Sequence, residues 1–430
     1  MSIPSRLSIF AACLSLTCQA PAAAQDAHAG RVLRVGQSET VRTIAQAARL
    51  AQDGDIVEIE AGEYVGDVAV WTQSELTLRA VHGRARLTAA GASAEGKAIW
   101  VVRGGNITIE NIDFRGARVP DRNGAGIRFE QGRLVIRNCS FIDNENGILT
   151  AGGGATLEIE NSEFGYNGAG DGFSHNVYVG PLEKFKVTGS YFHHARIGHL
   201  LKSRARENLV LYNRLSDESG GQASYELEFP NGGVAYVIGN LIEQSATTEN
   251  SIIISFGAEG YAWTSNELYL ASNTIVDDSA TAGTFLFVKP GKAVVRAVNN
   301  LLVANLPREV QPPSKQAAQS AANMATADTW ALVGSKGRPG NNSYADRTQF
   351  VFPAGFDYHL KAPSSLTARF IPPGSANQLS LVPQYEYVHP SAIRGLSAKP
   401  SVPGAFQLPD SGLQQMQGQG KGTQVDMHKH

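Results

Sequence analysis

Short apolar strands that end in an asparagine recur along the middle of the chain. The strongest copies read ITIEN, LVIRN, LEIEN and FKVTG, and weaker copies follow them. The residues that close these strands, called markers below, are Asn111, Asn138, Asn161, Gly189, Asn213, Asn240, Asn273 and Asn300. Seven intervals cover the 189 residues from the first marker to the last, a mean of 27 residues. Self-similarity at this period predicts a solenoid, in which each turn buries its apolar face by stacking on its neighbours.

A second apolar strand lies about 14 residues before the next marker, as in GIRF at 126–129, GILT at 147–150 and SIIISF at 251–256. Strands that alternate with turns, with no helical pattern between them, predict an all-β parallel β-helix rather than a βαβ fold. Stacked markers can pass amide hydrogen bonds along a ladder, so we interpret them as structural residues. The Phe three residues after each strong marker is expected in the core: Phe114, Phe141, Phe164 and Phe192.

One amphipathic helix is predicted before the repeat, over residues 38–54. Its apolar positions share one face at a period of 3.6 residues: Val41, Ile44, Ala48 and Ala51. Ser38 or Thr40 can cap its start, and Gly54 can end it. Because the end of a solenoid is an open apolar edge, we expect this helix to lie across the first turn as a cap.

The two ends of the chain differ from the repeat. Residues 1–24 carry Arg6, a short apolar run and a small-residue site before Gln25, which predicts a signal peptide and a secreted or periplasmic protein. Residues 25–305 are expected to form the capped β-helix, 306–408 an extension that packs on it, and 409–430 a disordered tail. Loss of the signal would leave Cys139 as the remaining cysteine, so no disulfide within the chain is expected.

The net charge narrows the classes of partner. Without Arg6 the chain has 36 basic and 39 acidic residues, a net charge of −3, so no overall field attracts nucleic acid. No apolar run after the signal approaches the roughly 20 residues of a membrane helix, so no integral membrane segment is expected. We expect a monomer in which any anion binding is local.

Three stretches resemble a known superfamily. VRTIAQAARLAQDGDIVEIEAGEY is similar to the entry segment of right-handed parallel β-helix proteins of the pectate lyase-like superfamily. The marked turns resemble the same superfamily over roughly residues 35–305, and DYHLKAPSS and PGAFQ resemble its closing segments. The resemblance implies a single-stranded right-handed β-helix with a groove for an extended glycan. Polysaccharide lyases and pectin-type hydrolases are its commonest enzymes, beside esterases, epimerases and non-catalytic binders.

One branch of lyases in this superfamily carries a Glu-x-Glu pair that binds calcium, with a Lys and an Arg for acid and base catalysis. Glu226 and Glu228 match the acidic pair, so the resemblance implies Ca²⁺ at these two residues. The Lys expected shortly after the pair is absent, because Phe229, Pro230 and Asn231 stand there. Lys202, one turn earlier, is the candidate replacement.

Polar residues gather in three adjacent turns, within 174–180, 193–206 and 223–233. Residues at equal distances from successive markers should stack. His175, His199 and Glu226 lie 14 residues before the next marker, and Tyr178 and Lys202 lie 11 before it. The spacing therefore predicts that these side chains form one patch.

Strand alternation places Glu226, Glu228, Asn176 and Tyr178 on the outside. In GHLLK, an outward Lys202 puts His199 inside, which conflicts with the stacking count unless the strand is bulged.

The patch contains what cleavage of a uronate glycan by β-elimination requires. Lys202, Arg204 or a metal on Glu226 and Glu228 can neutralise the uronate carboxylate. Lys202, His175 or His199 can remove the α-proton, and Tyr178 can protonate the leaving oxygen. The remaining polar residues are expected to bind substrate: Arg206, Asn176 and Asn231.

Three other interpretations stay open. The charged residues can form a surface ion network, which is common and weak. Glu226 and Glu228 can serve a glycoside hydrolase, since i and i+2 on one strand face lie roughly 7 Å apart. The protein can also be a glycan-binding or cell-surface scaffold without catalysis. Two acids beside three basic residues favour an anionic-polysaccharide lyase over the ion network.

Overall fold

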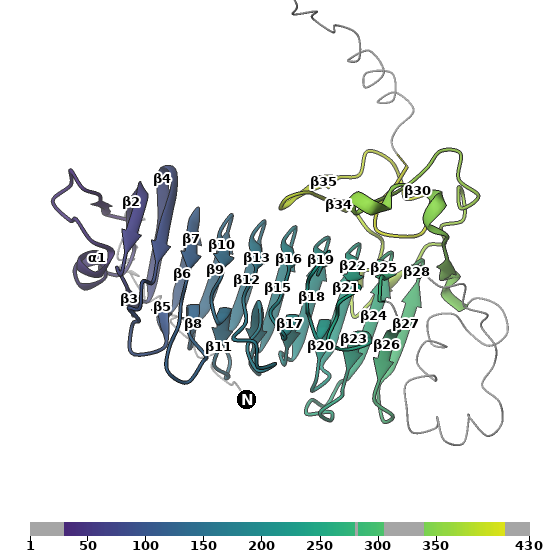
Figure 1. Ribbon diagram of the computed structural model, residues 1–430, viewed down its shortest axis with the longest axis horizontal. Coiled ribbons are helices and arrows are strands. Elements are labelled where there is room, and N and C mark those ends of the chain that lie inside the picture. The colour runs from purple at the N-terminus through teal and green to yellow at the C-terminus, as the bar shows by residue number, and fades with distance from the viewer. Residues whose placement is uncertain (1–29, 280–282, 305–338, 409–430) are drawn as a thin grey trace, which may run out of the picture.

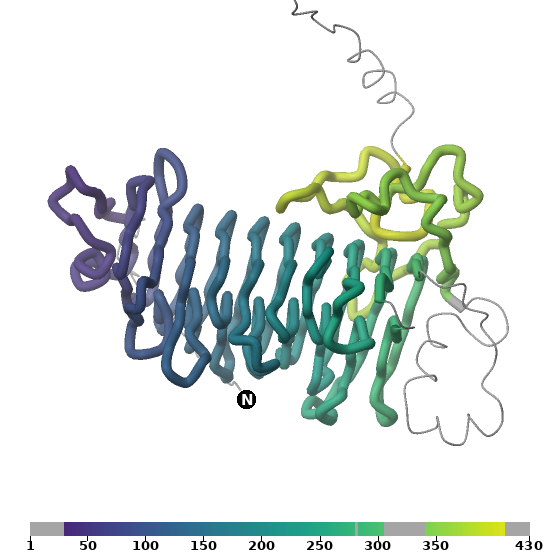
Figure 2. Tube along the Cα trace, viewed as in Figure 1, coloured from purple at the N-terminus to yellow at the C-terminus, as the bar shows by residue number. Residues whose placement is uncertain are grey.

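The computed structural model describes residues 30–279, 283–304 and 339–408. The predicted signal peptide at 1–24 and the predicted tail at 409–430 lie outside the described residues. Within the described part the chain winds into a parallel β-helix with three strands in each turn (Figures 1 and 2). The predicted all-β solenoid is confirmed.

One side of the solenoid is a nine-stranded parallel sheet, called the first sheet below. Its strands are β3 (Ala69–Trp71), β5 (Ala98–Val102), β8 (Ala125–Phe129), β11 (Asn146–Thr150), β14 (Val177–Val179), β17 (His199–Ser203), β20 (Tyr225–Phe229), β23 (Ile252–Phe256) and β26 (Thr284–Val288).

Two further ladders of parallel strands complete each turn. The second ladder contains β1 (Val32–Val35), β2 (Asp55–Val65), β4 (Glu75–Thr88), β6 (Asn106–Glu110), β9 (Arg133–Arg137), β12 (Thr156–Glu160), β15 (Lys184–Thr188), β18 (Glu207–Leu211), β21 (Val234–Ile238), β24 (Glu267–Ala271) and β27 (Val294–Val298). The third contains β7 (Ile112–Arg115), β10 (Ser140–Ile142), β13 (Glu163–Gly165), β16 (Tyr191–His193), β19 (Arg214–Ser216), β22 (Leu241–Gln244), β25 (Thr274–Asp277), β28 (Leu301–Ala304) and β29 (Ser343–Tyr344). The long strands β2 and β4 pair over the length of both ladders.

The turn between the second and third ladders explains the marker. One residue there has a positive φ in every turn, at Asn111, Asn138, Asn161, Gly189, Tyr212, Gly239, Ser272 and Asn299. From Asn213 onward the Asn follows this residue instead of occupying it. The markers therefore mix two adjacent positions of the turn, and counts from Asn213 and later markers run one residue late.

The later asparagines form the predicted ladder. Asn240 Nδ2 donates to Asn273 Oδ1 (3.0 Å) and to the Val210 carbonyl (2.8 Å). Its Oδ1 accepts the backbone N–H and the Nδ2 of Asn213 (2.8 and 3.0 Å). The same bonds continue through Asn300 to Asn342. The ladder satisfies buried backbone groups that would otherwise lose their hydrogen bonds with water.

Asn240→Ala is expected to lower the free energy of unfolding by about 2 kcal/mol, because it leaves buried donors and acceptors without partners. The measurement is the urea midpoint of unfolding. Asn123→Ala is the control, since Asn123 is exposed and its side chain bonds Asp121 alone among the described residues. Equal midpoints for the two variants would contradict a stabilising role for the ladder.

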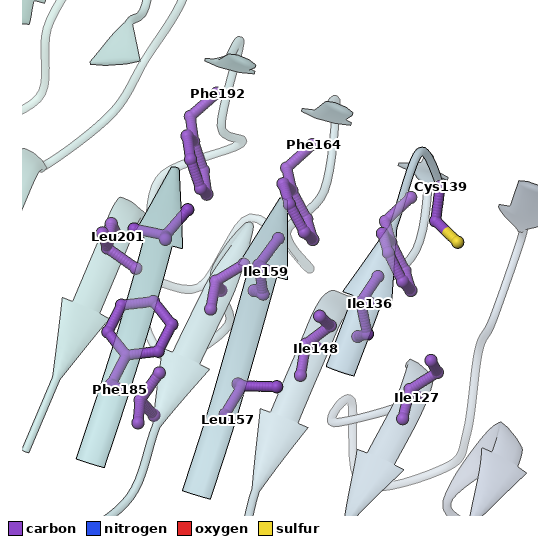
Figure 3. Close-up of a cluster of buried hydrophobic side chains, with 14 of the residues drawn as sticks. Ile127, Ile136, Cys139, Ile148, Leu157, Ile159, Phe164, Phe185, Phe192 and Leu201 are labelled. Carbon is purple, nitrogen blue, oxygen red and sulfur yellow. The ribbon is translucent and has the colours of Figure 1, made fainter. Parts of the chain in front are cut away.

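The core confirms the prediction for the phenylalanines. Phe114, Phe141, Phe164 and Phe192 stack face to face with ring centroids 4.9, 4.8 and 4.8 Å apart. Figure 3 shows Phe164 and Phe192 beside aliphatic side chains of neighbouring turns. Cys139 is buried and free, and burial raises its pKa to about 12. Each turn thus covers the apolar side chains of the next.

The N-terminal helix is shorter than predicted. Helix α1 spans Ile44–Leu50, and Thr43, not Ser38 or Thr40, caps it by accepting the Gln46 N–H. Val41 lies before the helix in a bridge with Val35. The helix contacts β1 and β3 at the first turns, as a cap should. Across 30–279, 283–304 and 339–408, no helix has both the length and the apolar character that a bilayer span requires.

Residues 339–408 fold back on the third ladder (Figure 2). They contain η1 (Pro339–Asn341), η2 (Arg347–Gln349), η3 (Pro353–Gly355), β30 (Phe350–Phe352), β31 (Asp357–Leu360), β32 (Ser375–Ala376), β33 (Leu379–Ser380), β34 (Tyr385–Val388) and β35 (Ala392–Gly395). Phe350, Tyr358 and Phe406 pack with Val276 and Val303 in one buried cluster. This segment covers the third ladder and lies away from the polar patch of the first sheet.

Candidate functional site

An irregularity in the first sheet sets which side chains face outward. Between β17 and β20 the register pairs His199 with Tyr225 and Leu201 with Leu227, and passes over Leu200. Leu200 and Leu201 are both buried. Two successive inward residues interrupt the alternation in both strands, with no shift of register between them. His199 and Lys202 therefore face the same side, although the strand pair carries no extra residue of the kind that defines a β-bulge.

Glu226 occupies the inward position that matches Leu200. It is 0% exposed, and neither carboxylate oxygen has a partner from another residue among those described. The prediction that Glu226 faces outward beside Glu228 is therefore wrong. That prediction came from strict alternation along the strand, which the two successive buried residues Glu226 and Leu227 interrupt.

Asn176 lies at the same inward position one turn before Leu200 and two turns before Glu226. Its Oδ1 accepts Asn167 Nδ2 (2.7 Å), and its Nδ2 donates to the His193 carbonyl (2.9 Å). Asn176 is fully buried in this short ladder. The prediction that Asn176 lies on the outside of the strand is therefore wrong.

Tyr178, Lys202 and Glu228 stack in register on β14, β17 and β20. Glu228 is almost buried, and its Oε2 lies 2.8 Å from His199 Nε2 and 3.0 Å from Lys202 Nζ. Burial alone would raise the pKa of Glu228, but the hydrogen bonds from His199 and Lys202 outweigh it and lower that pKa. The predicted stacking of Tyr178 and Lys202 is confirmed.

His175 and His199 lie behind Lys202. His199 Nδ1 is 3.1 Å from His175 Nδ1, which also accepts the His199 backbone N–H at 3.0 Å. Burial lowers the pKa of both imidazoles, most strongly that of His175, while Glu228 partly opposes the shift at His199. Both ring nitrogens of His199 are engaged, one with His175 and one with Glu228, so His199 is placed to hold Glu228.

Arg204 joins the patch from the turn after β17. Its Nε donates to the Tyr178 hydroxyl oxygen at 2.8 Å, and its Nη1 bonds Asn231 Oδ1. The guanidinium also lies over the Tyr178 ring, 5.7 Å from the centroid. Asn231 therefore holds Arg204, in addition to its predicted place near a substrate.

Glu259 was not among the predicted site residues and lies on the loop between β23 and β24, two turns after Lys202. It accepts a two-pronged contact from Arg204 (2.6 and 3.0 Å) and one from Lys202 Nζ (3.1 Å). These contacts lower the pKa of Glu259 to about 2, with the Arg204 hydrogen bond the largest cause. No periodic signal could have found it, since loop lengths do not follow the repeat.

Arg206 stands apart from this group. It pairs with Glu183, and both side chains are about half exposed. Among the described residues its ion-pair partner is Glu183, so the structure does not bring Arg206 into the cluster of Lys202 and Arg204.

The residues present do not fit the expected calcium pair. Glu226 lies inside the solenoid, and Glu228 is held by His199 and Lys202. In the described ranges, no group of three or more His, Cys, Asp or Glu side chains is arranged to hold a metal ion. No catalytic step is therefore assigned to calcium.

Glu226 instead belongs to a buried acidic group with Asp217 and Glu243 from the third ladder and its turn. Burial raises the pKa of all three carboxyls, that of Asp217 to about 7. Repulsion from Asp217 and, to a smaller extent, from Glu243 adds to the upward shift of the Glu226 pKa. This group is a feature of the interior and not of the outer patch.

Comparison with known proteins agrees with this architecture. Residues 92–305 match the family model described as right handed beta helix region. Pectate lyase Pel9A is a similar solved structure, with a TM-score of 0.54, 12% identity, and coverage of 88% of this chain and 96% of that chain. A mutant of the PL6-family alginate lyase AlyGC gives a TM-score of 0.31 at 13% identity, covering 86% of this chain and 59% of that one.

No curated protein sequence gives a significant match. The family match and the Pel9A superposition both concern the coiled strands on which the patch stands. The chain is a parallel β-helix protein whose fold is similar to that of pectate lyase Pel9A, and about half of it, residues 92–305, matches the right handed beta helix region model.

Proposed function

We propose that this protein is an exported polysaccharide lyase that cleaves an anionic, uronate-containing glycan by β-elimination. One observation carries the proposal: Arg204, Lys202 and Tyr178 converge on the outer face of the first sheet, with each cation held by further side chains. The lyase-like fold supports the same reaction class.

The reaction removes the proton on the carbon beside the uronate carboxyl group and breaks the bond to the glycosidic oxygen at C4. The electron pair of the broken C–H bond forms the C4=C5 double bond, and the leaving oxygen takes up a proton. A cation on the carboxylate makes the first proton more acidic by stabilising the charge that develops there. The reaction therefore needs a cationic clamp, a base and an acid.

Arg204 binds the uronate carboxylate in this proposal, because its planar guanidinium group can donate two parallel hydrogen bonds to a carboxylate. Lys202 acts as the base in its neutral form, after its ammonium group has released a proton to solvent, and its Nζ lies beside the Arg204 guanidinium on the outward face. His175 and His199 are less suited, because both are buried and their ring nitrogens face each other or Glu228. Tyr178 is the acid: Arg204 donates to its oxygen, which leaves the hydroxyl proton for the leaving group.

The hydrolase alternative loses its carboxylate pair. Glu226 is inside the solenoid and Glu228 is on the outer side, so the two cannot flank one glycosidic bond. A non-catalytic binder would use the same cationic clamp and is an outcome of the test below.

The test is incubation of the protein, with and without calcium, with polysaccharides built from galacturonate, glucuronate, mannuronate or guluronate. Ultraviolet absorbance of unsaturated ends supports the lyase. Reducing ends without that absorbance indicate hydrolysis, and retention of a polymer that is never shortened indicates a binder. The proposal is contradicted if none of the polysaccharides yields unsaturated ends, with or without calcium.

Tyr178→Phe is expected to lower kcat about 100-fold with little change in KM, because it removes the acid while keeping the ring. Initial rates on the polymer that responds in the panel measure the effect. Tyr236→Phe is the control, since Tyr236 is on β21 in the second ladder and its hydroxyl contacts Asn377. A Tyr178→Phe enzyme with more than half of the original kcat would exclude Tyr178 as the acid.

A further inference from the structure

Glu259 differs from the other residues of the patch in its exposure. Its side chain is 45% exposed, whereas those of Lys202 and Arg204 are 11% and 19% exposed. Glu259 contacts both cations, and its two oxygens receive the two arms of the Arg204 fork. Its carboxylate thus lies between the cations and the solvent.

Each cation keeps other partners that do not depend on Glu259. Lys202 is held by the nearly buried Glu228, and Arg204 by Tyr178 and Asn231. Departure of the Glu259 side chain would leave both cations in position. The site left by Glu259 would then present the Arg204 guanidinium and the Lys202 ammonium group to the same incoming carboxylate.

The backbone around Glu259 is fixed, so its side chain is the part that is free to move. The Glu259 N–H donates to the Pro230 carbonyl (3.0 Å), and the Ala262 N–H donates to the Asn231 carbonyl (3.0 Å). The Gly260 N–H closes a turn onto the Gly257 carbonyl (2.8 Å). A rotation about the side-chain bonds of Glu259 would uncover the cations without refolding of the loop.

We propose that the Glu259 carboxylate occupies the subsite for the uronate carboxylate of the glycan, and that a carboxylate-bearing sugar displaces it. This rests on the proposed function only in assigning the ligand as a uronate. A carboxylate of the same shape and charge can make the same contacts with Arg204 and Lys202. A neutral sugar cannot compensate for the loss of the ion pairs of Glu259, because it forms no ion pair with Arg204 or Lys202.

The displaced carboxylate would therefore act as a specificity filter. Exposed ion pairs are weak individually, so a uronate with further contacts to the protein can replace them. A ligand without a carboxylate would find Arg204 and Lys202 already paired with Glu259. The Glu259 side chain would thus act as a competitor within the protein that excludes neutral ligands.

Glu259→Gln tests the proposal, because glutamine keeps the shape of the side chain but lacks its charge. The probes are methyl uronosides of the four uronates in the panel and the matching neutral methyl hexosides. The uronosides carry no sugar on O4 and are not cleaved, so binding is measured apart from catalysis. Dissociation constants come from ligand-observed NMR titration.

We expect Glu259→Gln to bind at least one methyl uronoside about three- to tenfold more tightly than the unchanged protein. Binding of the neutral hexosides should not change. Glu183→Gln is the matched control, since it removes an exposed carboxylate from Arg206 without touching Lys202 or Arg204. The control should leave the uronoside affinity unaltered.

The outcomes separate this proposal from the lyase assignment. Tighter uronoside binding without cleavage of any polymer supports the subsite and rejects the lyase. Polymer cleavage with unchanged or weaker uronoside binding in Glu259→Gln overturns the subsite while the lyase stands. Absence of uronoside binding in both proteins, or equal tightening for neutral hexosides, also overturns the subsite.

Discussion

Replacing Lys202 with methionine is expected to lower kcat on a uronate polymer by about 10²- to 10⁴-fold, the range over which a positioned acid or base contributes. Lys202 Nζ lies beside the Arg204 fork, where the α-proton of a clamped uronate would be presented. Rates of formation of unsaturated ends measure the effect. Lys184→Met is the control, because Lys184 pairs with Glu207 on the second ladder.

Lys202→Arg separates a base from a simple positive charge. Arginine keeps the charge opposite Glu228 but does not give up its proton near neutral pH. The arginine variant should therefore be about as inactive as the methionine variant while its thermal midpoint stays near that of the unchanged protein. Recovery of activity in Lys202→Arg would show that Lys202 acts through its charge alone.

Glu226→Gln is expected to stabilise the protein at neutral and alkaline pH. The pKa of Glu226 is raised in the folded state by burial and by Asp217 and Glu243. The folded protein then holds a proton that the unfolded chain has lost, so stability falls as pH rises above the unfolded pKa of about 4.3. Below that pH the group is protonated in both states and the contribution is fully present.

The increase in the free energy of unfolding caused by Glu226→Gln should be near zero at pH 4. It should grow by about 1.4 kcal/mol per pH unit until the pKa of Glu226 in the folded protein is reached. Urea unfolding of both proteins between pH 4 and pH 8 measures this. Glu228→Gln gives the matched contrast two residues away. The pKa of Glu228 is lowered in the folded state, so its contribution is present at neutral pH and is lost as pH falls.

Glu228→Gln should therefore destabilise the protein at pH 7, and its penalty should shrink as the solution is acidified. A gap between Glu226→Gln and the unchanged protein that stays constant from pH 4 to pH 8 would contradict the raised pKa of Glu226.

The fold was predictable because the same pattern of strand, turn and core residue recurs many times along the chain. Phe114, Phe141 and Phe164 each lie three residues after a positive-φ Asn, so the same packing rule can be read in turn after turn. An error in one copy does not change the period. The helix boundary was less predictable, because the Thr43 cap depends on how the chain leaves the bridge of Val41 with Val35.

The site was predictable in part. Tyr178, Lys202 and Glu228 came together because they obey strand register. Glu226 and Asn176 were misplaced because each is buried directly before another inward residue, which breaks the alternation, and the neighbouring side chains give no signal of this. Glu259 could not be found, since its loop reaches the patch from two turns away and no period governs loop length.

The register of the patch also bears on how such a protein can change. Tyr178, Lys202 and Glu228 stand on three neighbouring strands, which in any sheet are about 4.8 Å apart. The spacing between acid, base and counter-ion is thus a property of the backbone pitch and not of any one side chain. Substitution of one outward residue on a single strand can therefore introduce a new functional group, while the side chains on the strands before and after it keep their spacing.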